Sequence, residues 1–423
     1  MAWTTTTSTR RYSQRSGTPD SGIYGRRHRP DYWLVALCAV LLGIGLIVVY
    51  AIGPALSESR GVSSMYYVDK QLIAIALSGV AFLVMSRVPL GFIRRMYKPV
   101  LVLAAIATLV ALVMPVNPNY PAHRWVRFGS LSFQSVELLK FAILLWFAGF
   151  LAEHIQNRTL GDGRRILTPI LIAVGIIGVI VAGAQSDLGS AGVIIAILAA
   201  MVFVAGLPMK RILLILAVIG IGGLLAITST PYRRERVTAF LNPESNCQTA
   251  SGWQACQALI AVGSGGMVGL GLGRSVQAYG YLPEAANDSI FAIYAEKFGF
   301  IGSILLLAVF VAFFARMKKI AEHAPDDFTR LIVVGIFTWF GVQTLVNIGA
   351  MIGLLPLKGI TLPFISYGGT SVVFLAAAVG LVFQISRYTS YTQLAAKERG
   401  TYDNSHDRRR IRGAYHPDFS GRS

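Results

Sequence analysis

The sequence predicts an all-α integral membrane protein of about ten transmembrane helices. Hydrophobic residues make up 54% of its 423 residues, and only 14% are charged, whereas soluble proteins carry roughly 25% charged residues. The charges gather in short clusters between apolar runs of about 17 to 25 residues, a length that crosses the bilayer core as a helix. Together these observations exclude a soluble globular class.

Ten apolar runs are long enough to be membrane-spanning helices. They cover residues 32–52, 69–86, 99–116, 136–155, 167–183, 189–206, 212–229, 289–315, 330–354 and 370–386. Residues 1–30 and 388–423 are polar and basic, and we expect two disordered tails there. The sequence therefore predicts one transmembrane domain over residues 31–387.

The distribution of basic residues predicts the orientation. They gather in both tails and in alternate short loops, for example at Arg94, Arg164 and Lys318. The positive-inside rule then places both termini in the cytoplasm and residues 230–288, between the seventh and eighth helices, outside as a large loop. The net charge of +18 is explained by topology signals and by attraction to anionic lipids, so we expect no nucleic-acid partner.

The predicted outer loop carries two features with open interpretations. It carries several arginines, Arg274 among them. Either they have no special role, because long loops are translocated regardless of their charge, or they bind an anionic ligand such as a phosphate. Cys247 and Cys256 lie nine positions apart in a compartment that permits a disulfide, and two free thiols are the alternative. Cys38 falls within the first helix, where we expect an inert packing residue.

One pair of residues and one single acid near the predicted outer ends of helices could carry chemistry. Glu137 and Lys140 share one helix face at i and i+3, either as a structural pair or as a polar lining for a substrate path. Asp187 precedes a helix, where it is either an N-cap or part of a site.

A third stretch, 262–302, combines many glycines with isolated acids. Its glycine spacing matches neither common phosphate-loop motif, so we reject a nucleotide site. Glu284 and Asp288 would lie one helical turn apart if this stretch is already helical, and Glu296 falls inside the next helix. An acid at an apolar boundary is a candidate general base because partial desolvation makes it more basic, although an N-cap or surface acid is the alternative.

A fourth stretch, 347–371, is broken by proline and glycine at membrane depth. Non-helical backbone there is tolerated only when it is buried in protein or lines a cavity. Lys358 and Ser366 would offer hydrogen-bond donors to such a cavity.

These stretches, in their sequence and in their order along the chain, resemble the signature regions of the SEDS family of membrane proteins. The resemblance is to the FtsW-like branch more than to the RodA-like one. The matching pieces are HRWVRFG…SFQSVELLK, QSDLGSA, AFLNPE with GLGRSVQ…YLPEAANDSIFAI, and NIGAMIGLLPLKGITLPFISYGGTS. The similarity runs over residues 32–386.

The resemblance implies a glycosyltransferase that polymerises lipid II, an undecaprenyl-pyrophosphate-linked disaccharide peptide, on the outer face of the bacterial cytoplasmic membrane. It implies a class B penicillin-binding protein as transpeptidase partner, other division proteins as neighbours, and an essential acid at Asp288. Further positions typical of the family are Arg124, Trp125, Gln134, Glu137, Lys140, Gln185, Asp187, Glu284, Glu296, Lys358 and Ser366.

An α-linked pyrophosphate and a β-linked product require inversion at the sugar carbon, which one displacement achieves. We therefore expect Asp288 as the general base, and Arg124, Lys140, Lys358 and Arg274 as phosphate partners. No ligand cluster demands a metal, and assistance by Mg²⁺ or Mn²⁺ stays open. A lipid flippase or transporter is the alternative, because broken helices with buried charges are transporter features as well. A third possibility is a scaffold protein without enzymatic activity.

Overall fold

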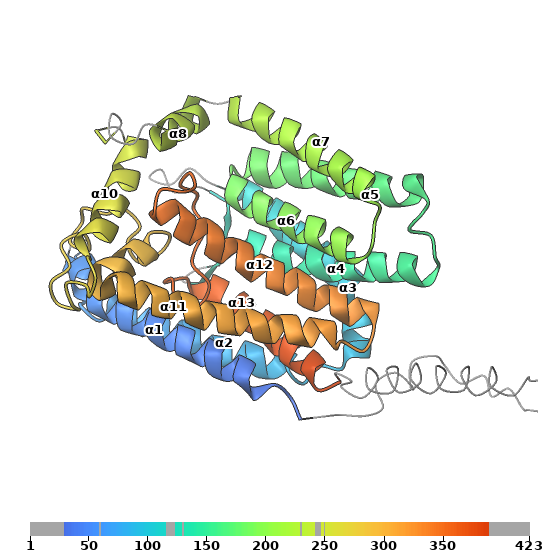
Figure 1. The fold of residues 1–423 in the computed structure, drawn as a ribbon, viewed down its shortest axis with the longest axis horizontal. Helices are drawn as coiled ribbons and strands as arrows, with labels where there is room; N and C mark the ends of the chain where they lie inside the picture. Colours follow the sequence, from blue (N-terminus) through green and yellow to red (C-terminus); the bar gives the residue numbers. More distant parts are fainter. Residues whose placement is uncertain are drawn as a thin grey trace, which may run out of the picture.

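The computed structural model describes residues 29–58, 61–115, 123–128, 131–228, 231–241, 247–248 and 250–388. Long helices run side by side along one axis of the molecule (Figure 1). Apart from residues 29, 30 and 388, the two predicted tails lie outside the described residues.

Ten apolar helices account for the ten predicted runs. They are α1 (Tyr32–Glu58), α2 (Tyr66–Met85), α3 (Leu90–Val113), α4 (Ser135–Gln156), α5 (Gly163–Ile177) with the π-helical turn η1 (Gly178–Ala184), α6 (Leu188–Val204), α7 (Met209–Thr228), α11 (Ile290–Glu322), α12 (Asp327–Met351) and α13 (Gly369–Ser386). Eight are long and apolar enough to cross a membrane, and α6 is an apolar helix of 17 residues. The all-α membrane class is therefore confirmed.

Four short elements were not predicted. Strands β1 (Trp125–Phe128) and β2 (Leu131–Gln134) form an antiparallel hairpin in which Trp125 pairs with Gln134. Helices α8 (Pro231–Leu241) and α10 (Ala250–Ser264) lie in the long segment between α7 and α11. We call the end of the bundle that carries α10 and residues 265–289 the long-loop end (Figure 1).

The centre of the bundle is formed by α4 and α12. Helix α4 packs against α3, α6 and α12, and α12 also packs against α11. Close approach needs small residues: a Cβ on Gly335 of α12 would lie 2.7 Å from Leu144 Cγ of α4. Similarly, a Cβ on Gly380 of α13 would lie 2.6 Å from the carbonyl oxygen of Phe82 on α2.

Charged residues join the helices at the end opposite the long loop. Arg316 of α11 donates to the Asp31 carboxylate at 2.9 and 2.5 Å, and the Asp31 amide donates to Ser386 Oγ at 3.0 Å. Arg94 of α3 pairs with Asp326, which caps α12. The described chain thus enters and leaves the bundle at one end, as an even number of spans requires.

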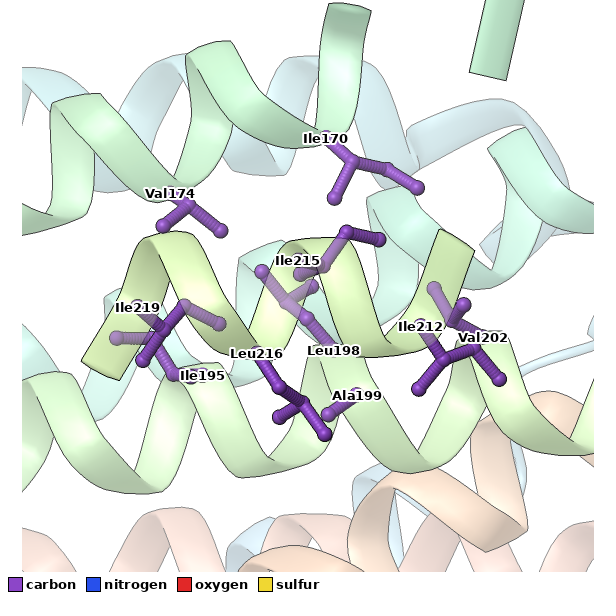
Figure 2. A pocket seen from close by; sticks show the side chains of 10 residues that line it. All are labelled: Ile170, Val174, Ile195, Leu198, Ala199, Val202, Ile212, Ile215, Leu216 and Ile219. Carbon is purple, nitrogen blue, oxygen red and sulfur yellow. The ribbon is translucent and has the colours of Figure 1, made fainter. Parts of the chain in front are cut away.

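An aliphatic pocket lies between α5, α6 and α7 (Figure 2). Its lining comes from all three helices and includes Ile170, Leu198 and Ile215. None of the lining side chains is polar, so this pocket offers no group that could react with or bind a polar substrate.

Helix α11 is broken at Gly299, whose backbone has φ 64°. The glycine-rich segment 265–271 supplies partners for the interrupted helix. Leu270 and Gly271 donate to the carbonyls of Glu296 and Lys297 at 2.9 and 3.0 Å. In return, the Gly266 and Met267 carbonyls accept from Phe300 and Ile301 at 2.9 and 3.1 Å.

The glycines of this segment permit a close approach of two backbones. A Cβ on Gly265 would lie 2.1 Å from the Ala295 carbonyl oxygen, and one on Gly269 would lie 2.2 Å from the Lys297 oxygen. The pattern that superficially suggests a phosphate loop therefore serves helix packing.

We expect Gly269→Ala to destabilise the protein strongly, because its Cβ would overlap the Lys297 carbonyl and its φ of +82° disfavours any side chain. Gly263→Ala is the matched control, since a Cβ there meets nothing within 4 Å. Thermal unfolding in detergent should show a large drop for the first and none for the second. Equal unfolding temperatures would contradict the close approach.

The charge asymmetry predicts that Gln277 lies outside and His323 inside. Alkaline phosphatase fused after Gln277 should be active, and the same enzyme fused after His323 should be inactive. The reverse pair of activities would invert the predicted orientation of the whole chain.

Candidate active site

Asp288 lies two residues before α11, at the long-loop end, and is half-buried. The Asn347 amide of α12 donates to the Asp288 carbonyl at 2.6 Å and to the Ile360 carbonyl at 2.7 Å. One side chain therefore joins the segment that carries Asp288 to residues 352–368, which connect α12 to α13 and which we call the strap.

Two further hydrogen bonds join the strap to this segment. Ser366 Oγ donates to the Asn287 carbonyl at 2.7 Å, and it accepts from the Leu362 amide at 2.8 Å. The Tyr367 amide donates to the Ala286 carbonyl at 2.8 Å. The second half of the predicted broken segment, residues 360–366, is thus mostly buried in protein, whereas residues 352–355 are exposed, and Ser366 fixes the backbone next to Asp288.

The carboxylate of Asp288 and the guanidinium of Arg124 face one point in the strap. A Cβ on Gly359 would lie 3.2 Å from Asp288 Oδ2 and 3.9 Å from Arg124 Nη1. Any larger residue at Gly359 would crowd both groups. Lys358, the preceding residue, is half-buried.

Arg124 is held by the segment between η1 and α6. Its Nη2 donates to the Ser186 carbonyl at 2.7 Å, its Nε donates to the Gln185 carbonyl at 3.3 Å, and Nε lies 3.9 Å from Asp187 Oδ2. Asp187 is buried and also caps α6 through the Ser190 amide at 2.9 Å. Asp187 is therefore an N-cap whose second oxygen faces Arg124, and its part in a site stays a prediction.

Three of the four non-glycine residues with positive φ in the described chain lie in the segments around this site. They are Ser186 at 53°, Glu284 at 52° and Phe364 at 64°. Such backbones cost on the order of 1–3 kcal/mol each and are typical of functional sites. The Glu284 side chain accepts from Asn287 Nδ2 at 2.5 Å, so it stabilises the turn before Asp288.

Glu137 and Lys140 form a buried ion pair. Lys140 Nζ lies 2.7 Å from Glu137 Oε1 and 5.5 Å from the centre of the Trp339 ring. Both side chains are almost inaccessible, so the structural interpretation of the pair fits the packing. Nearby, Gln185 Nε2 donates to Ser135 Oγ at 3.1 Å. This bond connects α4 to residues 185 and 186, whose carbonyls hold Arg124.

Glu296 anchors the long loop. Its buried carboxylate accepts from the Val276 and Gln277 amides at 2.9 and 3.2 Å, and from the Ser275 hydroxyl. These three bonds satisfy the carboxylate, so the structure gives Glu296 a loop-anchoring contact and none with the strap among the described residues.

The remaining predicted residues lie at the margins. Arg274 is exposed on the long loop, and Trp125 is 40% exposed on β1. The backbone amide of Gln134 donates to Thr370 Oγ1 at 3.3 Å, where β2 meets α13.

Asn347 and Gly359 were not singled out from the sequence. The available signal for Asn347 was a side-chain amide within an apolar run, which must find polar partners within the protein, but Gln343 of the same helix gives the same signal. Gly359 gave no separate signal, because its importance arises from the contact of three distant segments.

Within the described ranges, no group of three or more His, Cys, Asp or Glu side chains is arranged to hold a metal ion. Cys247 and Cys256 are joined by a disulfide with Cα atoms 5.7 Å apart, and Cys38 is a free, buried cysteine.

The sequence profile of the FtsW/RodA/SpoVE family, described as cell cycle proteins, matches residues 32–391. The chain belongs to this family. The predicted FtsW-like resemblance is thereby confirmed, and it spans all ten apolar helices.

Individual proteins of known name are also similar. The chain is 38% identical over 368 residues to the probable peptidoglycan glycosyltransferase FtsW of Saccharophagus degradans, covering 85% of this chain and 92% of that one. It is 36% identical to stage V sporulation protein E of Bacillus subtilis, covering 86% and 99%. A solved structure described as "Structural coordination of polymerization and crosslinking by a peptidoglycan synthase complex" superposes with a TM-score of 0.70 at 26% identity, covering 85% and 98%.

We expect Glu137→Gln to destabilise this FtsW/RodA/SpoVE family member, because it leaves Lys140 buried without its anionic partner. Breaking a buried pair costs roughly 3–5 kcal/mol, whereas replacing both partners is often close to neutral. Thermal unfolding should therefore fall for Glu137→Gln and largely recover in Glu137→Gln/Lys140→Met. A double variant no more stable than the single one would contradict a structural pair.

Proposed function

We propose that the protein is a peptidoglycan glycosyltransferase that polymerises lipid II by an inverting mechanism, with Asp288 as the general base. The proposal rests on the position of the half-buried Asp288 carboxylate. This carboxylate and the Arg124 guanidinium both lie within 4 Å of the place that a Cβ on Gly359 would occupy. A base and a cation facing one position are what glycosyl transfer from a pyrophosphate requires.

In the proposed reaction, Asp288 accepts the proton of the acceptor sugar hydroxyl. The hydroxyl oxygen attacks the anomeric carbon of the donor, and a new carbon–oxygen bond forms. The bond from that carbon to the pyrophosphate oxygen breaks, and the electron pair leaves with undecaprenyl pyrophosphate. One displacement converts the α-linkage into a β-linkage, in parallel with inverting glycosidases.

Cationic groups stabilise the negative charge of the departing pyrophosphate in this scheme. Arg124 is preorganised by two backbone carbonyls and by Asp187, so it loses little conformational freedom when substrate binds. Lys358 lies next to Gly359 and is the second candidate. Lys140 is already paired with Glu137, so a role in phosphate binding becomes less favourable for it.

Arg274, Trp125, Gln134 and Gln185 remain proposals as substrate contacts of the same site. Among them, Gln185 has the best supported position, because its carbonyl holds Arg124. Glu284 is proposed as a positioning residue through its bond with Asn287.

We further propose that the enzyme works in septal wall synthesis, at the outer face of the bacterial cytoplasmic membrane, beside a class B penicillin-binding protein. Two facts support this: FtsW proteins are among its relatives, and one similar structure is described as a peptidoglycan synthase complex. Imaging a tagged copy at the septum or along the side wall tests the division role.

We expect Asp288→Asn to abolish polymerisation, because it keeps the shape and removes the basicity. A lost general base typically lowers a rate roughly 100- to 10,000-fold. Purified protein with fluorescent lipid II, with and without the partner synthase, measures glycan chains directly. Glu284→Gln should be milder, because its contact is with Asn287.

Membrane insertion and yield of Asp288→Asn should match the wild type and serve as its control. A rate above about a tenth of the wild-type rate would reject Asp288 as the base, given the effect expected for such a group. Movement of lipid between leaflets without polymer would instead support a flippase.

A further inference from the structure

The glycine-rich segment next to the break in α11 exposes apolar side chains. Residues 258–273 contain no charged residue, and Ser264 is their one polar side chain. Met267 is 63% exposed, Val268 76%, Leu270 37% and Leu272 47%. A water-exposed loop seldom presents four large apolar side chains within six residues, so this segment is adapted to an apolar partner.

The exposed side chains continue the outward-facing surface of α11. Phe300 donates to the Gly266 carbonyl and Ile301 donates to the Met267 carbonyl, so the segment lies directly against the helix below its break. From there, α11 exposes Phe300, Ile301, Ile304 and Leu305, each by about half of its surface. In a membrane-spanning helix that surface faces lipid.

The depth of the segment follows from the length of α11. The helix rises by about 1.5 Å per residue, so the 19 steps from Gly299 to Lys318 span roughly 29 Å. The hydrocarbon core of a bilayer is about 30 Å thick. With the basic cluster around Lys318 at one boundary, Gly299 and the segment paired with it lie at the opposite boundary.

We infer that residues 267–272 form an interfacial wedge whose apolar side chains enter the bilayer at the level of the phospholipid headgroups and upper acyl chains. We commit to a lipid surface as the occupant, because the segment lies at the depth of the bilayer boundary and continues the lipid-facing surface of α11. Amphipathic anchors of this kind bind through buried apolar area.

The wedge is firmly connected to the rest of the long loop. Lys297 Nζ donates to the Leu272 carbonyl at 2.7 Å, and Glu296 holds residues 275–277 immediately afterwards. The loop that leads to Asp288 is thus held at bilayer depth by both α11 and lipid. The inference does not depend on the proposed reaction, because it concerns depth and not chemistry.

A nitroxide at Val268→Cys tests the wedge in the full-length protein reconstituted alone into phospholipid nanodiscs. Cys38 is buried and the other two cysteines are bridged, so the added thiol is the accessible one. Power-saturation electron paramagnetic resonance measures collisions with oxygen, which is enriched in lipid, and with a nickel chelate, which stays in water.

Two positions calibrate the measurement: Leu305→Cys on the outward face of α11 and Arg234→Cys on α8, which is exposed and charged. We expect the ratio of oxygen to nickel collisions at Val268 to be severalfold above the ratio at Arg234 and near that at Leu305. Leu272→Cys, at the other end of the wedge, should give the same result if the Val268 variant folds poorly.

A ratio at Val268 equal to that at Arg234 would overturn the inference, because the segment would then lie in water. Low collision rates with both reagents would overturn it as well and would indicate a protein contact between copies. Only high oxygen and low nickel accessibility agrees with insertion into lipid.

Discussion

A backbone amide or carbonyl at membrane depth must find its partner within the protein, since lipid provides none. The ten apolar helices meet this requirement internally. Where α11 breaks at Gly299 and where the strap leaves α12, other segments supply the missing donors and acceptors. In the described part of the long-loop end, residues 265–271 are thus interlocked with α11, and residues 286–288 are interlocked with α12 and the strap, which gives the candidate site its defined geometry.

The site is held mainly by bonds to backbone atoms. Asn347 joins the Asp288 and Ile360 carbonyls, Ser366 of the strap donates to the Asn287 carbonyl, and Arg124 is oriented by the carbonyls of residues 185 and 186. Bonds to the backbone next to Asp288 fix where its side chain starts, and the Arg124 guanidinium is held by its own Nε and Nη2 atoms. The Asp288 carboxylate and the Arg124 guanidinium thereby face Gly359 from two sides, and a preorganised site needs groups held in this way.

Sequence patterns predicted the ten helices to within a few residues at most ends, because hydropathy is set by local composition. The start of α3 was the largest miss: it begins at Leu90 and not at 99, since its first turns are charged. Asp288 was one of two candidate acids at an apolar boundary, and the family resemblance singled it out; its role as the base stays a prediction. The hairpin, Gly359 and the anchoring contact of Glu296 were not found, because four-residue strands carry little periodicity and such contacts join residues about 20 or more positions apart.

The pairing between residues 266–271 and residues 296–301 also bears on biogenesis. The glycine-rich segment is synthesised first, and its partners follow some thirty residues later. Until the ribosome has delivered the first turns of α11, the earlier segment has apolar side chains and unpaired amides but nothing to dock on. The long loop can therefore take its final form only after α11 has been inserted, so maturation of the site is a late event in the assembly of the chain.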